Sequence, residues 1–271
     1  MPGILLPGDF QIKRRNMKPR AENLFVNVPW FKTWFDSTYY HKLYAHHNDA
    51  EAADFINELI AVLQPVTGSV MLDVGCGMGR HCKHLGAKGF NVTGIDLALS
   101  SIREAKKYET SSVRFFQHDM RQPYGTNRFD NIFNFFTSFG YFKTEQEHYK
   151  ILSNMSNALK QGGTLLLDYM NVHYTEDHLI LKEEKEIDGI IYHITRWMDE
   201  KFFYKKILID VHQSGGQPEF TEQVARFNLH DFNKMFAANN LESKEVFGDY
   251  KLTGFDVKNS PRLIMIAKKA A

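Results

Sequence analysis

The stretch LDVGCGMGRHCKH, residues 72–84, decides the fold because it links a predicted strand to a predicted helix through three glycines. The strand SVMLDV comes immediately before Gly75, and Gly77 and Gly79 follow at every second position. Glycine allows a tight turn and lets the backbone approach a ligand closely, with the N-terminus of the next helix nearby. The pattern therefore predicts a turn that binds a nucleotide-like ligand.

The same stretch contains residue types that bind transition metals, namely Cys76, His81, Cys82 and His84. Neighbouring residues on a helix point in different directions, and the chain has only 2 cysteines with which to build a structural zinc site. We therefore expect no metal here. Cys82 is expected to be a small packed residue, and both histidines are expected on the helix surface or the pocket rim.

The composition limits the classes of partner. A chain of 271 residues with 43% hydrophobic content can bury one core, with room for a smaller lobe. Its 33 Lys and Arg against 32 Asp and Glu give a net charge of +1, which offers no general attraction to nucleic acid or an anionic membrane. We therefore expect a small or locally recognised partner, and neither nucleic acid nor a membrane.

The cysteine content and the N-terminal region indicate the cell compartment in which we expect the protein. Two cysteines do not make a disulfide framework, and the sequence shows neither a signal-peptide pattern nor a long apolar run, so we expect a cytoplasmic protein. Residues 1–25 combine prolines with a basic cluster and show no periodicity, so we expect a flexible arm. The cluster consists of Lys13, Arg14, Arg15, Lys18 and Arg20.

Strand and helix patterns alternate around the glycine turn. We predict helices at 30–44, at 49–63, directly after the glycines, near 100–108, at 144–160 and at 230–239. We predict strands at 69–74, 89–96, 112–119, 129–136, 164–170, 242–250 and 262–267. The glycines of Gln161-Gly162-Gly163 are expected to end the helix before the fifth strand. This alternation predicts a parallel α/β sheet, with the last two strands as an antiparallel pair at its edge.

After Asn171 the pattern changes to extended segments. Four candidates, at 179–186, 190–198, 202–213 and 219–229, are separated by turn signals at 188–189 and 214–218. This spacing predicts an antiparallel sheet inserted into the α/β unit.

Two acidic residues narrow the choice of ligand. Asp73 stands two residues before Gly75, and the third glycine comes one residue earlier than in the dinucleotide fingerprint Gly-x-Gly-x-x-Gly. A carboxylate so close to the turn would repel phosphate and would suit an ammonium group. Asp96 ends the second strand, where a carboxylate can accept hydrogen bonds from both ribose hydroxyls. A ribose is thus expected both in a dinucleotide and in a ligand that carries an ammonium group. The spacing of the glycines distinguishes these two classes of cofactor.

Together these segments resemble the ordered motifs of the class I S-adenosylmethionine-dependent methyltransferases. The matching segments, within residues 70–171, are LDVGCGMGR, VTGIDLA, FFQHDM, FDNIFNFFTSFGYF and LKQGGTLLLDYMN. The similarity is greatest to the small-molecule branch, which carries a β-sheet insertion after the fifth strand. The resemblance implies a Rossmann-like, seven-stranded, mostly parallel sheet with an antiparallel edge hairpin, preceded by N-terminal helices.

The resemblance also implies a domain division. The cofactor-binding domain would comprise residues 26–172 and 230–271, and residues 173–229 would form an inserted antiparallel substrate lid. Trp197, Phe202, Phe203 and Tyr204 lie in this insertion, which could cover the substrate or form a homodimer interface.

For the cofactor S-adenosylmethionine, the resemblance implies a set of contacts along the glycine turn. The methionine moiety would lie against the backbone of Gly75, Cys76 and Gly77, with Gly79 completing the turn. The ammonium group would lie near Asp73 or nearby backbone.

Further contacts would come from the following segments. Arg80 would pair with the cofactor carboxylate, Asp96 would hold the ribose hydroxyls, and Leu97 would pack on the adenine. Asp119 would accept a hydrogen bond from the adenine amino group, with the backbone amide of Met120 close by. Phe135, together with Phe136, would lie beneath the sulfonium.

Methyl transfer requires alignment of a nucleophile, exclusion of water and, for some acceptors, removal of a proton. Candidates lie at the ends of the fourth and fifth strands, where open α/β sheets bind ligands. His173 has the pKa range of a general base, and Tyr141 could orient an acceptor amine or hydroxyl. Tyr39 and Tyr40 lie on the N-terminal segment that, by resemblance, closes over the cofactor. The other candidates are Thr137, Ser138, Asp168, Tyr169 and Asn171.

The sequence thus predicts methyl transfer from S-adenosylmethionine to a nitrogen or oxygen atom of a small metabolite, natural product or amino sugar. Three alternatives remain open. An RNA methyltransferase would need a basic face around the pocket. A non-catalytic S-adenosylmethionine-binding module would bind without turnover. An NAD-dependent oxidoreductase would need the dinucleotide spacing of glycines.

Overall fold

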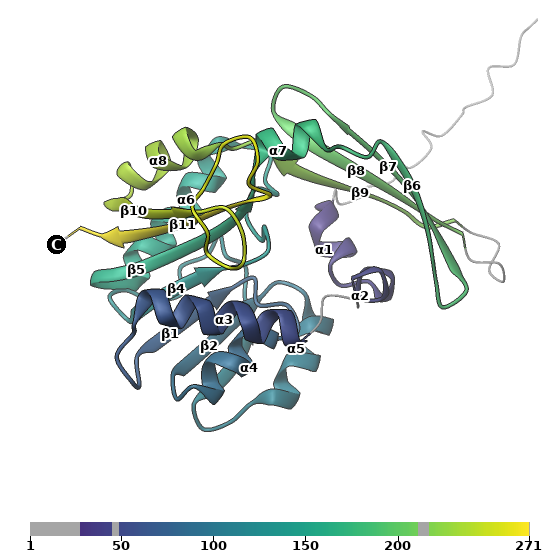
Figure 1. The fold of residues 1–271 in the computed structure, drawn as a ribbon. Coiled ribbons are helices and arrows are strands. Elements are labelled where there is room, and N and C mark those ends of the chain that lie inside the picture. Colours follow the sequence, from purple (N-terminus) through teal and green to yellow (C-terminus); the bar gives the residue numbers. More distant parts are fainter. Residues whose placement is uncertain (1–27, 45–48, 211–216, 271) are drawn as a thin grey trace, which may run out of the picture.

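The computed structural model describes residues 28–44, 49–210 and 217–270 (Figure 1). The expected flexible arm and its basic cluster lie outside the described residues, as does most of the turn predicted at 214–218. Two β-sheets, one of seven strands and one of four, account for the architecture. Figure 1 shows short helices α1 and α2 lying between them.

The seven-stranded sheet has the order β10-β11-β5-β4-β1-β2-β3. Strand β11 pairs antiparallel with β10 and β5, and the remaining neighbours are parallel. Its strands are β1 Val70–Val74, β2 Asn91–Asp96, β3 Val113–Gln117, β4 Phe129–Asn134, β5 Leu159–Met170, β10 Leu241–Phe247 and β11 Arg262–Lys269. The predicted fold class, a mostly parallel Rossmann-like sheet with an antiparallel edge hairpin, is confirmed.

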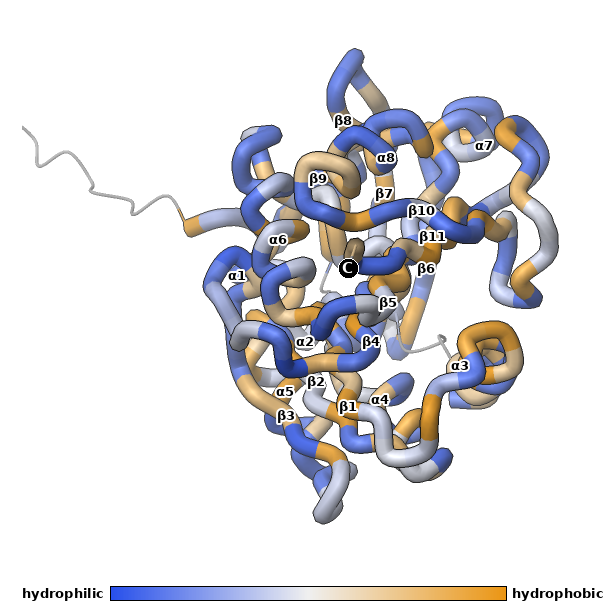
Figure 2. Tube along the Cα trace, turned by 90° about the vertical axis from the view of Figure 1, so that its left-hand side faces the viewer, coloured by the Kyte–Doolittle hydropathy of each residue, from blue (hydrophilic) through white to orange (hydrophobic). Residues whose placement is uncertain are grey.

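Helices cover both faces of this sheet. Residues of α3 Asp49–Leu63, α4 Arg80–Ala87 and α5 Leu99–Ala105 belong to one buried cluster, and those of α6 Glu145–Ala158 and α8 Leu229–Ala237 belong to another. A short 3₁₀ turn, Lys106–Tyr108, continues α5. Figure 2 shows hydrophobic residues concentrated along the central strands and hydrophilic ones along the outer loops.

The central strand β5 explains the run of leucines in TLLLDYM. Leu165 and Leu167 pack into the cluster on the α6 and α8 side, and Leu166 packs into the cluster on the other side. All three are 0% exposed. Because side chains alternate along a strand, a strand covered on both faces requires apolar residues at consecutive positions.

The inserted sheet, called the lid sheet below, has the antiparallel order β6-β7-β8-β9. Its strands are β6 Lys182–Ile187, β7 Ile190–Met198, β8 Phe202–Asp210 and β9 Glu219–Ala225. Asp188 and Gly189 both have positive φ, 51° and 72°, as a two-residue hairpin turn requires. One face of the lid sheet packs on α1 and α2, where its Tyr192 and Ile207 join a buried cluster with Trp34. The predicted antiparallel insertion is confirmed.

Local boundaries differ from the sequence predictions in three places. The aromatic stretch forms two helices, α1 Trp30–Trp34 and α2 Thr38–Leu43, because the Ser37 side chain caps α2 by accepting from the Tyr40 amide at 3.1 Å. Helix α7, Val172–Asp177, was not predicted.

The third difference is at the end of α6. Gln161-Gly162-Gly163 does not end the helix, since α6 stops at Ala158 and the glycines lie inside β5. The pairing with β4 shifts register there, and Gly162 adopts a φ of 70°. The glycines thus provide an irregularity in the strand.

Among the helices in the described ranges, none combines the length and the apolar character needed to cross a membrane.

Two buried hydrogen bonds join the lid sheet to β5 of the main sheet and to the loop that follows β4. The Tyr169 hydroxyl on β5 donates to the Ala225 carbonyl at 2.6 Å, and the Ala225 amide donates to the Gly140 carbonyl at 2.8 Å. Gly140 has a φ of 95°, and a Cβ there would lie 2.2 Å from the Tyr169 hydroxyl. The close approach of the two sheets therefore requires glycine at this position.

We expect Tyr169→Phe to lower the free energy of unfolding by about 1–3 kcal/mol, because it leaves the buried Ala225 carbonyl without its donor. Urea denaturation measures the loss. Tyr204→Phe is the matched control, since its hydroxyl bonds Asp199 at an exposed position and its removal should cost less than about 0.5 kcal/mol. Equal losses in both variants would contradict this role of Tyr169.

Candidate cofactor site

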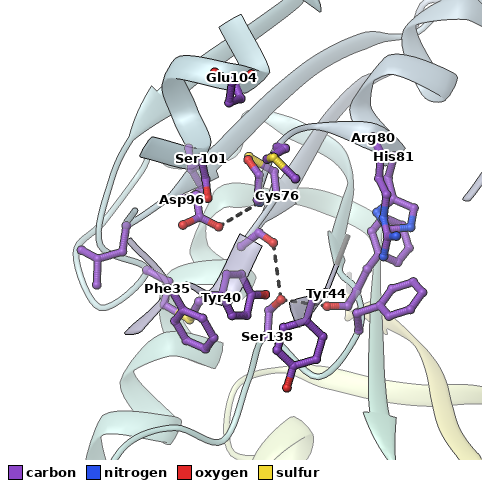
Figure 3. A pocket seen from close by; sticks show the side chains of 18 of the residues that line it. Phe35, Tyr40, Tyr44, Cys76, Arg80, His81, Asp96, Ser101, Glu104 and Ser138 are labelled. Carbon is purple, nitrogen blue, oxygen red and sulfur yellow. Dashed lines mark hydrogen bonds between the residues drawn. The ribbon is translucent and has the colours of Figure 1, made fainter. Parts of the chain in front are cut away.

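A cavity of about 340 Å³ lies at the carboxyl ends of β1, β2, β3 and β4 (Figure 3). One wall is formed by residues that follow these strands, and the segment of α1 and α2 supplies the opposite wall. The sheet side contributes Gly75, Cys76, Gly77, Asp96, Leu97, Asp119, Met120, Phe135, Phe136, Ser138 and Tyr141. The helical side contributes Phe31, Phe35, Tyr40, His41 and Tyr44. Most of the residues predicted to bind a cofactor are thus brought together.

The glycine turn is held by backbone hydrogen bonds to the next strand. The amides of Gly75 and Cys76 both donate to the Ile95 carbonyl, at 2.8 and 3.0 Å. Gly77 has a φ of 53°, and a Cβ there would meet nothing within 4 Å, so its backbone faces open space. Gly79 does not line the cavity. It has a φ of 80°, and a Cβ there would lie 2.6 Å from Phe115, so this glycine lets α4 pack closely on the sheet.

Asp96 lies at the cavity wall with its carboxylate fixed by backbone. One oxygen accepts from the Gly77 amide at 2.8 Å, and the other accepts from the Ala98 amide at 2.8 Å. Burial raises the pKa of this carboxyl, and these backbone donors oppose the shift. Each oxygen retains a lone pair with which to accept from a ligand hydroxyl. Leu97 adds an apolar surface beside it.

Asp119 is engaged by a residue that the sequence did not single out. Arg121 donates to its carboxylate through Nε and Nη2, at 3.1 and 2.7 Å, and Arg121 also bonds Glu147 at 3.0 Å. Burial opposes ionisation of Asp119, but the hydrogen bonds and charge of Arg121 outweigh it and lower the pKa. The two residues are separated by one position in the sequence, and this spacing is the signal from which their ion pair could have been predicted. Met120, between them, lines the cavity.

Asp73 is buried beneath the glycine turn and does not line the cavity. It is 0% exposed and accepts from the Cys82 thiol at 3.3 Å, and its Oδ1 has no hydrogen-bond partner among the residues that the structure describes. Alternation along β1 places its side chain on the same side as Met71, facing α4. The expected contact with a cofactor ammonium group therefore finds no support in this arrangement. Burial raises the pKa of Asp73 to about 7.

The first residues of helix α4 pack against Phe135 and Phe136, two aromatic residues of the cavity that follow β4. The Arg80 guanidinium lies 4.4 Å from the Phe136 ring centroid, and the His81 ring lies 4.5 Å from that of Phe135. His81 is 4% exposed, so it does not lie on the helix surface, but it does line the cavity, in line with the alternative expectation of a place at the pocket. It faces the sheet together with Cys82, which is packed as expected. Burial lowers the pKa of His81 far below its usual value.

His84 does lie toward the surface, where its Nε2 is 3.0 Å from an Asp49 carboxylate oxygen. Within residues 28–44, 49–210 and 217–270, no group of three or more His, Cys, Asp or Glu could hold a metal ion.

The two predicted catalytic residues differ in placement. Tyr141 lines the cavity and packs against Trp30 and Phe35, and burial raises its pKa well above the usual value. His173 does not line this cavity. Asn171 caps α7 and Val172 turns into the core, so His173 points to the surface with 46% of its side chain exposed.

The N-terminal helices bring in residues that sequence reasoning missed. His41 lines the cavity and its Nε2 lies 3.0 Å from the Ser100 hydroxyl. Tyr44 donates to Glu222 of the lid sheet at 3.0 Å, and Lys205 donates to Tyr44. These partners are far apart in the chain, so no local pattern could reveal them. Of the two predicted tyrosines, Tyr40 lines the cavity and Tyr39 does not.

Residues 71–163 match the family model of a methyltransferase domain. The chain is 29% identical over 119 residues to the dTDP-3-amino-3,4,6-trideoxy-alpha-D-glucopyranose N,N-dimethyltransferase of Streptomyces venezuelae, covering 44% of this chain and 49% of that protein. It is 26% identical over 193 residues to the tRNA U34 carboxymethyltransferase of Methylococcus capsulatus, covering 64% and 57%. The structure of the sugar N-methyltransferase KedS8 from Streptoalloteichus sp. matches with a TM-score of 0.69 and 16% identity, covering 99% of this chain and 100% of that one.

A Rossmann-like sheet with a glycine turn after β1 and an acid at the end of β2 defines a nucleotide-cofactor-binding protein. With the family match, it identifies a class I S-adenosylmethionine-dependent methyltransferase domain in this chain, as the sequence predicted. The chain spans about half the length of the curated relatives it matches first.

We expect Asp73→Asn to change how stability depends on pH. The folded-state pKa of Asp73, about 7, is above its unfolded value of 3.8, so the folded state binds more protons between these values. The stability of the natural chain should therefore fall as pH rises through this window, by up to about 4 kcal/mol from this group alone. Asn cannot ionise and should remove that component.

Urea unfolding from pH 5 to pH 8.5 measures the difference between the two proteins. The variant should gain stability relative to the natural chain as pH rises. A pH-independent difference would show that Asp73 does not titrate in this range. Asp54→Asn, an exposed acid on α3, is the control and should leave the pH profile unchanged.

Proposed function

We propose that this chain transfers a methyl group from S-adenosylmethionine to a nitrogen or oxygen atom of a small molecule. The observation that carries the proposal is the cavity itself, in which the glycine turn and Asp96 face an aromatic wall from α1 and α2. A cofactor lying on the turn would leave its reactive end toward that wall.

The residues present fit the cofactor. The open backbone at Gly77 suits close approach of the methionine moiety, and the guanidinium of Arg80 suits its carboxylate. Asp96 offers acceptor oxygens for ribose hydroxyls, and Leu97 with Met120 offers apolar surface for an adenine ring. When bound, S-adenosylmethionine supplies an activated methyl group, so the protein chiefly has to align the acceptor and exclude water.

The acceptor would enter the part of the cavity lined by tyrosines. Burial raises the pKa of Tyr40, Tyr44 and Tyr141, so these phenols remain protonated at neutral pH. Tyr44 donates its proton to Glu222, which leaves Tyr40 and Tyr141 as the tyrosines that could donate to an acceptor. Tyr141 would therefore orient an acceptor amine or hydroxyl and would not act as a base. His173, which lies outside the cavity, is not retained in a catalytic role.

The names of related proteins support an amine acceptor on a small molecule. One curated relative is named as an N,N-dimethyltransferase of a nucleotide-linked amino sugar, and KedS8 is named as a sugar N-methyltransferase. In this chain such an acceptor would bind between the carboxyl ends of the strands and helices α1 and α2, which line the cavity.

An RNA acceptor is the second candidate, since other relatives are named as tRNA and mRNA cap methyltransferases. Phosphate binding needs cations that are free to contact it. On the lid sheet, Arg196 pairs with Glu183 at 2.6 Å, and Lys206 pairs with Glu219 at 2.8 Å. This internal pairing favours a small neutral or cationic acceptor over a polyanion.

We expect Asp96→Ala to weaken S-adenosylmethionine binding at least tenfold, or about 1.4 kcal/mol, through loss of the ribose contacts and of the bond that fixes Gly77. Isothermal titration calorimetry measures the change. Asp54→Ala, on the exposed face of α3, should bind like the natural chain. Unchanged affinity in Asp96→Ala would refute the ribose assignment, and binding of NAD in place of S-adenosylmethionine would favour the oxidoreductase alternative.

A screen of acceptors with radiolabelled cofactor tests the proposed activity. We expect label in one or more small amines or alcohols, with amino sugars and their nucleotide conjugates as the first group, and none in bulk tRNA or capped mRNA. Label only in RNA would establish the second candidate. Cofactor binding without any labelled product would favour the non-catalytic module.

With an acceptor identified, we expect Tyr141→Phe to lower kcat/KM for the acceptor about tenfold or more and to leave cofactor affinity within about twofold. His173→Ala should leave both unchanged, because its side chain is at the surface. Steady-state kinetics with both variants separates the two assignments. A large loss in His173→Ala would restore the histidine as a candidate base.

We also propose that the lid sheet mediates formation of a homodimer. Trp197 is 40% exposed on the lid sheet and stacks on Tyr204, with ring centroids 5.1 Å apart. Analytical sedimentation compares the oligomeric state of the natural chain with that of Trp197→Lys. If the substituted protein still forms a dimer, the interface lies elsewhere.

A further inference from the structure

Asp168, at the end of β5, is a buried carboxylate that four donors hold in place. Arg262 of β11 donates to Oδ1 through Nε at 2.9 Å and through Nη2 at 2.6 Å. The Phe136 amide donates to Oδ2 at 2.8 Å, and the Tyr250 hydroxyl donates to the same oxygen at 3.3 Å. Asp168 is 0% exposed and does not line the cavity, so these contacts do not serve the ligand directly.

The segment that Asp168 holds has an unusual backbone. Phe136 and Thr137, which begin two residues after the end of β4, have φ values of 54° and 59°, a left-handed conformation that residues with a Cβ rarely adopt, least of all β-branched threonine. Such a conformation persists only where the surroundings impose it. Here the Thr137 amide donates to the Asp168 carbonyl at 3.0 Å, and Arg262 Nη2 donates to the Thr137 hydroxyl at 3.0 Å.

The left-handed turn sets the direction of an aromatic ring at the cavity wall. The Phe136 ring stacks on Tyr250, with centroids 4.9 Å apart and planes 24° apart. The Arg80 guanidinium lies over the same ring, 4.4 Å from its centroid, and both Phe136 and Arg80 line the cavity. Figure 3 shows Arg80 at the edge of the cavity, beside His81. A chain of contacts thus runs from the C-terminal strand through Asp168 and Phe136 to the arginine at the glycine turn.

We propose that Asp168, Arg262 and Tyr250 are positioning residues that fix Phe136 and, through its ring, hold Arg80 at the carboxylate end of the cofactor site. This inference rests on the proposed function for the identity of the ligand. The physical reason is that a free arginine side chain loses much rotamer entropy when it binds. An arginine already held on a rigid ring loses less, so affinity increases with the rigidity of the ring.

Calorimetry with a double-mutant cycle tests the coupling. Arg80→Ala should weaken S-adenosylmethionine binding at least tenfold in the natural chain, and Tyr250→Leu at least fivefold. In the Tyr250→Leu background, Arg80→Ala should cost no more than about twofold, because the arginine is no longer held. Tyr250 is partly exposed, so this variant is expected to fold, and circular dichroism checks it. Independent, multiplicative effects would overturn the proposal.

Arg262→Lys tests the buried end of the chain of contacts. Lysine keeps the charge beside Asp168 but cannot bond both Asp168 and Thr137 in the fork geometry of the guanidinium. We expect the same loss of coupling to Arg80 as in Tyr250→Leu. An Arg262→Lys protein in which Arg80→Ala still costs tenfold would show that Arg262 does not act through Phe136.

A second measurement needs no cofactor. Protons on the Arg80 side chain lie over the Phe136 ring and should show upfield ring-current shifts in the NMR spectrum of the free protein. These shifts should collapse toward ordinary values in Tyr250→Leu and Arg262→Lys and should persist in Tyr204→Leu, a control on the exposed lid sheet. Unchanged Arg80 resonances would overturn the proposal. Absence of S-adenosylmethionine binding by the natural chain would instead refute the proposed function and leave this readout intact.

Discussion

The bond between the Asp96 carboxylate and the Gly77 amide, 2.8 Å long, is the interaction on which the site depends. It joins the ends of two neighbouring parallel strands at the point where both must turn away from the sheet. Together with the bonds from Gly75 and Cys76 to the Ile95 carbonyl, it leaves the glycine turn with one arrangement. The cavity wall is therefore built before any ligand arrives, and a ligand does not have to order it.

The opposite wall depends on a different kind of contact. Helices α1 and α2 are short, and short helices are marginal on their own. They are held by aromatic packing and by the lid sheet, where Glu222 accepts from the Trp34 indole at 2.7 Å and from Tyr44 at 3.0 Å. Lys205 stands 3.8 Å from the same carboxylate, which offsets the cost of placing a charge at a largely covered position. The lid sheet thus shapes the cavity indirectly, through the helices it carries.

Much of the fold could be predicted because its signals are local. The alternation of strands and helices, the glycine turn and the Asp188-Gly189 hairpin each depend on residues adjacent in sequence, and the structure confirms them. One error comes from a tertiary contact and the other from a local cap. Two glycines read as a helix terminator lie within β5, because pairing with β4 continues past them. Ser37 divides an aromatic stretch that composition alone presents as continuous.

The candidate site could likewise be predicted only where its signals are local. The carboxyl ends of parallel strands meet at one edge of a sheet, and for this reason the sequence could place Asp96, Leu97 and Tyr141 at the cavity. His173 was misplaced because α7, which was not predicted, rotates it outward. His41, Glu222 and Arg121 escaped notice because their roles arise from contacts that span the chain or from packing that no motif records. Sequence spacing therefore locates the wall of the cavity that the strand ends form and leaves the helical wall to the structure.

Three aspartates at the ends of three strands show that the residue type alone does not determine the function of a residue. Asp73, Asp96 and Asp168 follow similar apolar runs, and each is covered by protein. Asp96 keeps lone pairs toward the cavity and so can bind a ligand. Asp168 is satisfied by Arg262 and its neighbours and so can only organise the wall. Asp73 has one oxygen without a hydrogen-bond partner among the described residues, and the cost of its burial outweighs the attraction of Arg80, so its protonation becomes part of the stability of the fold. The donors that surround each carboxylate, and not its place in a motif, assign its function.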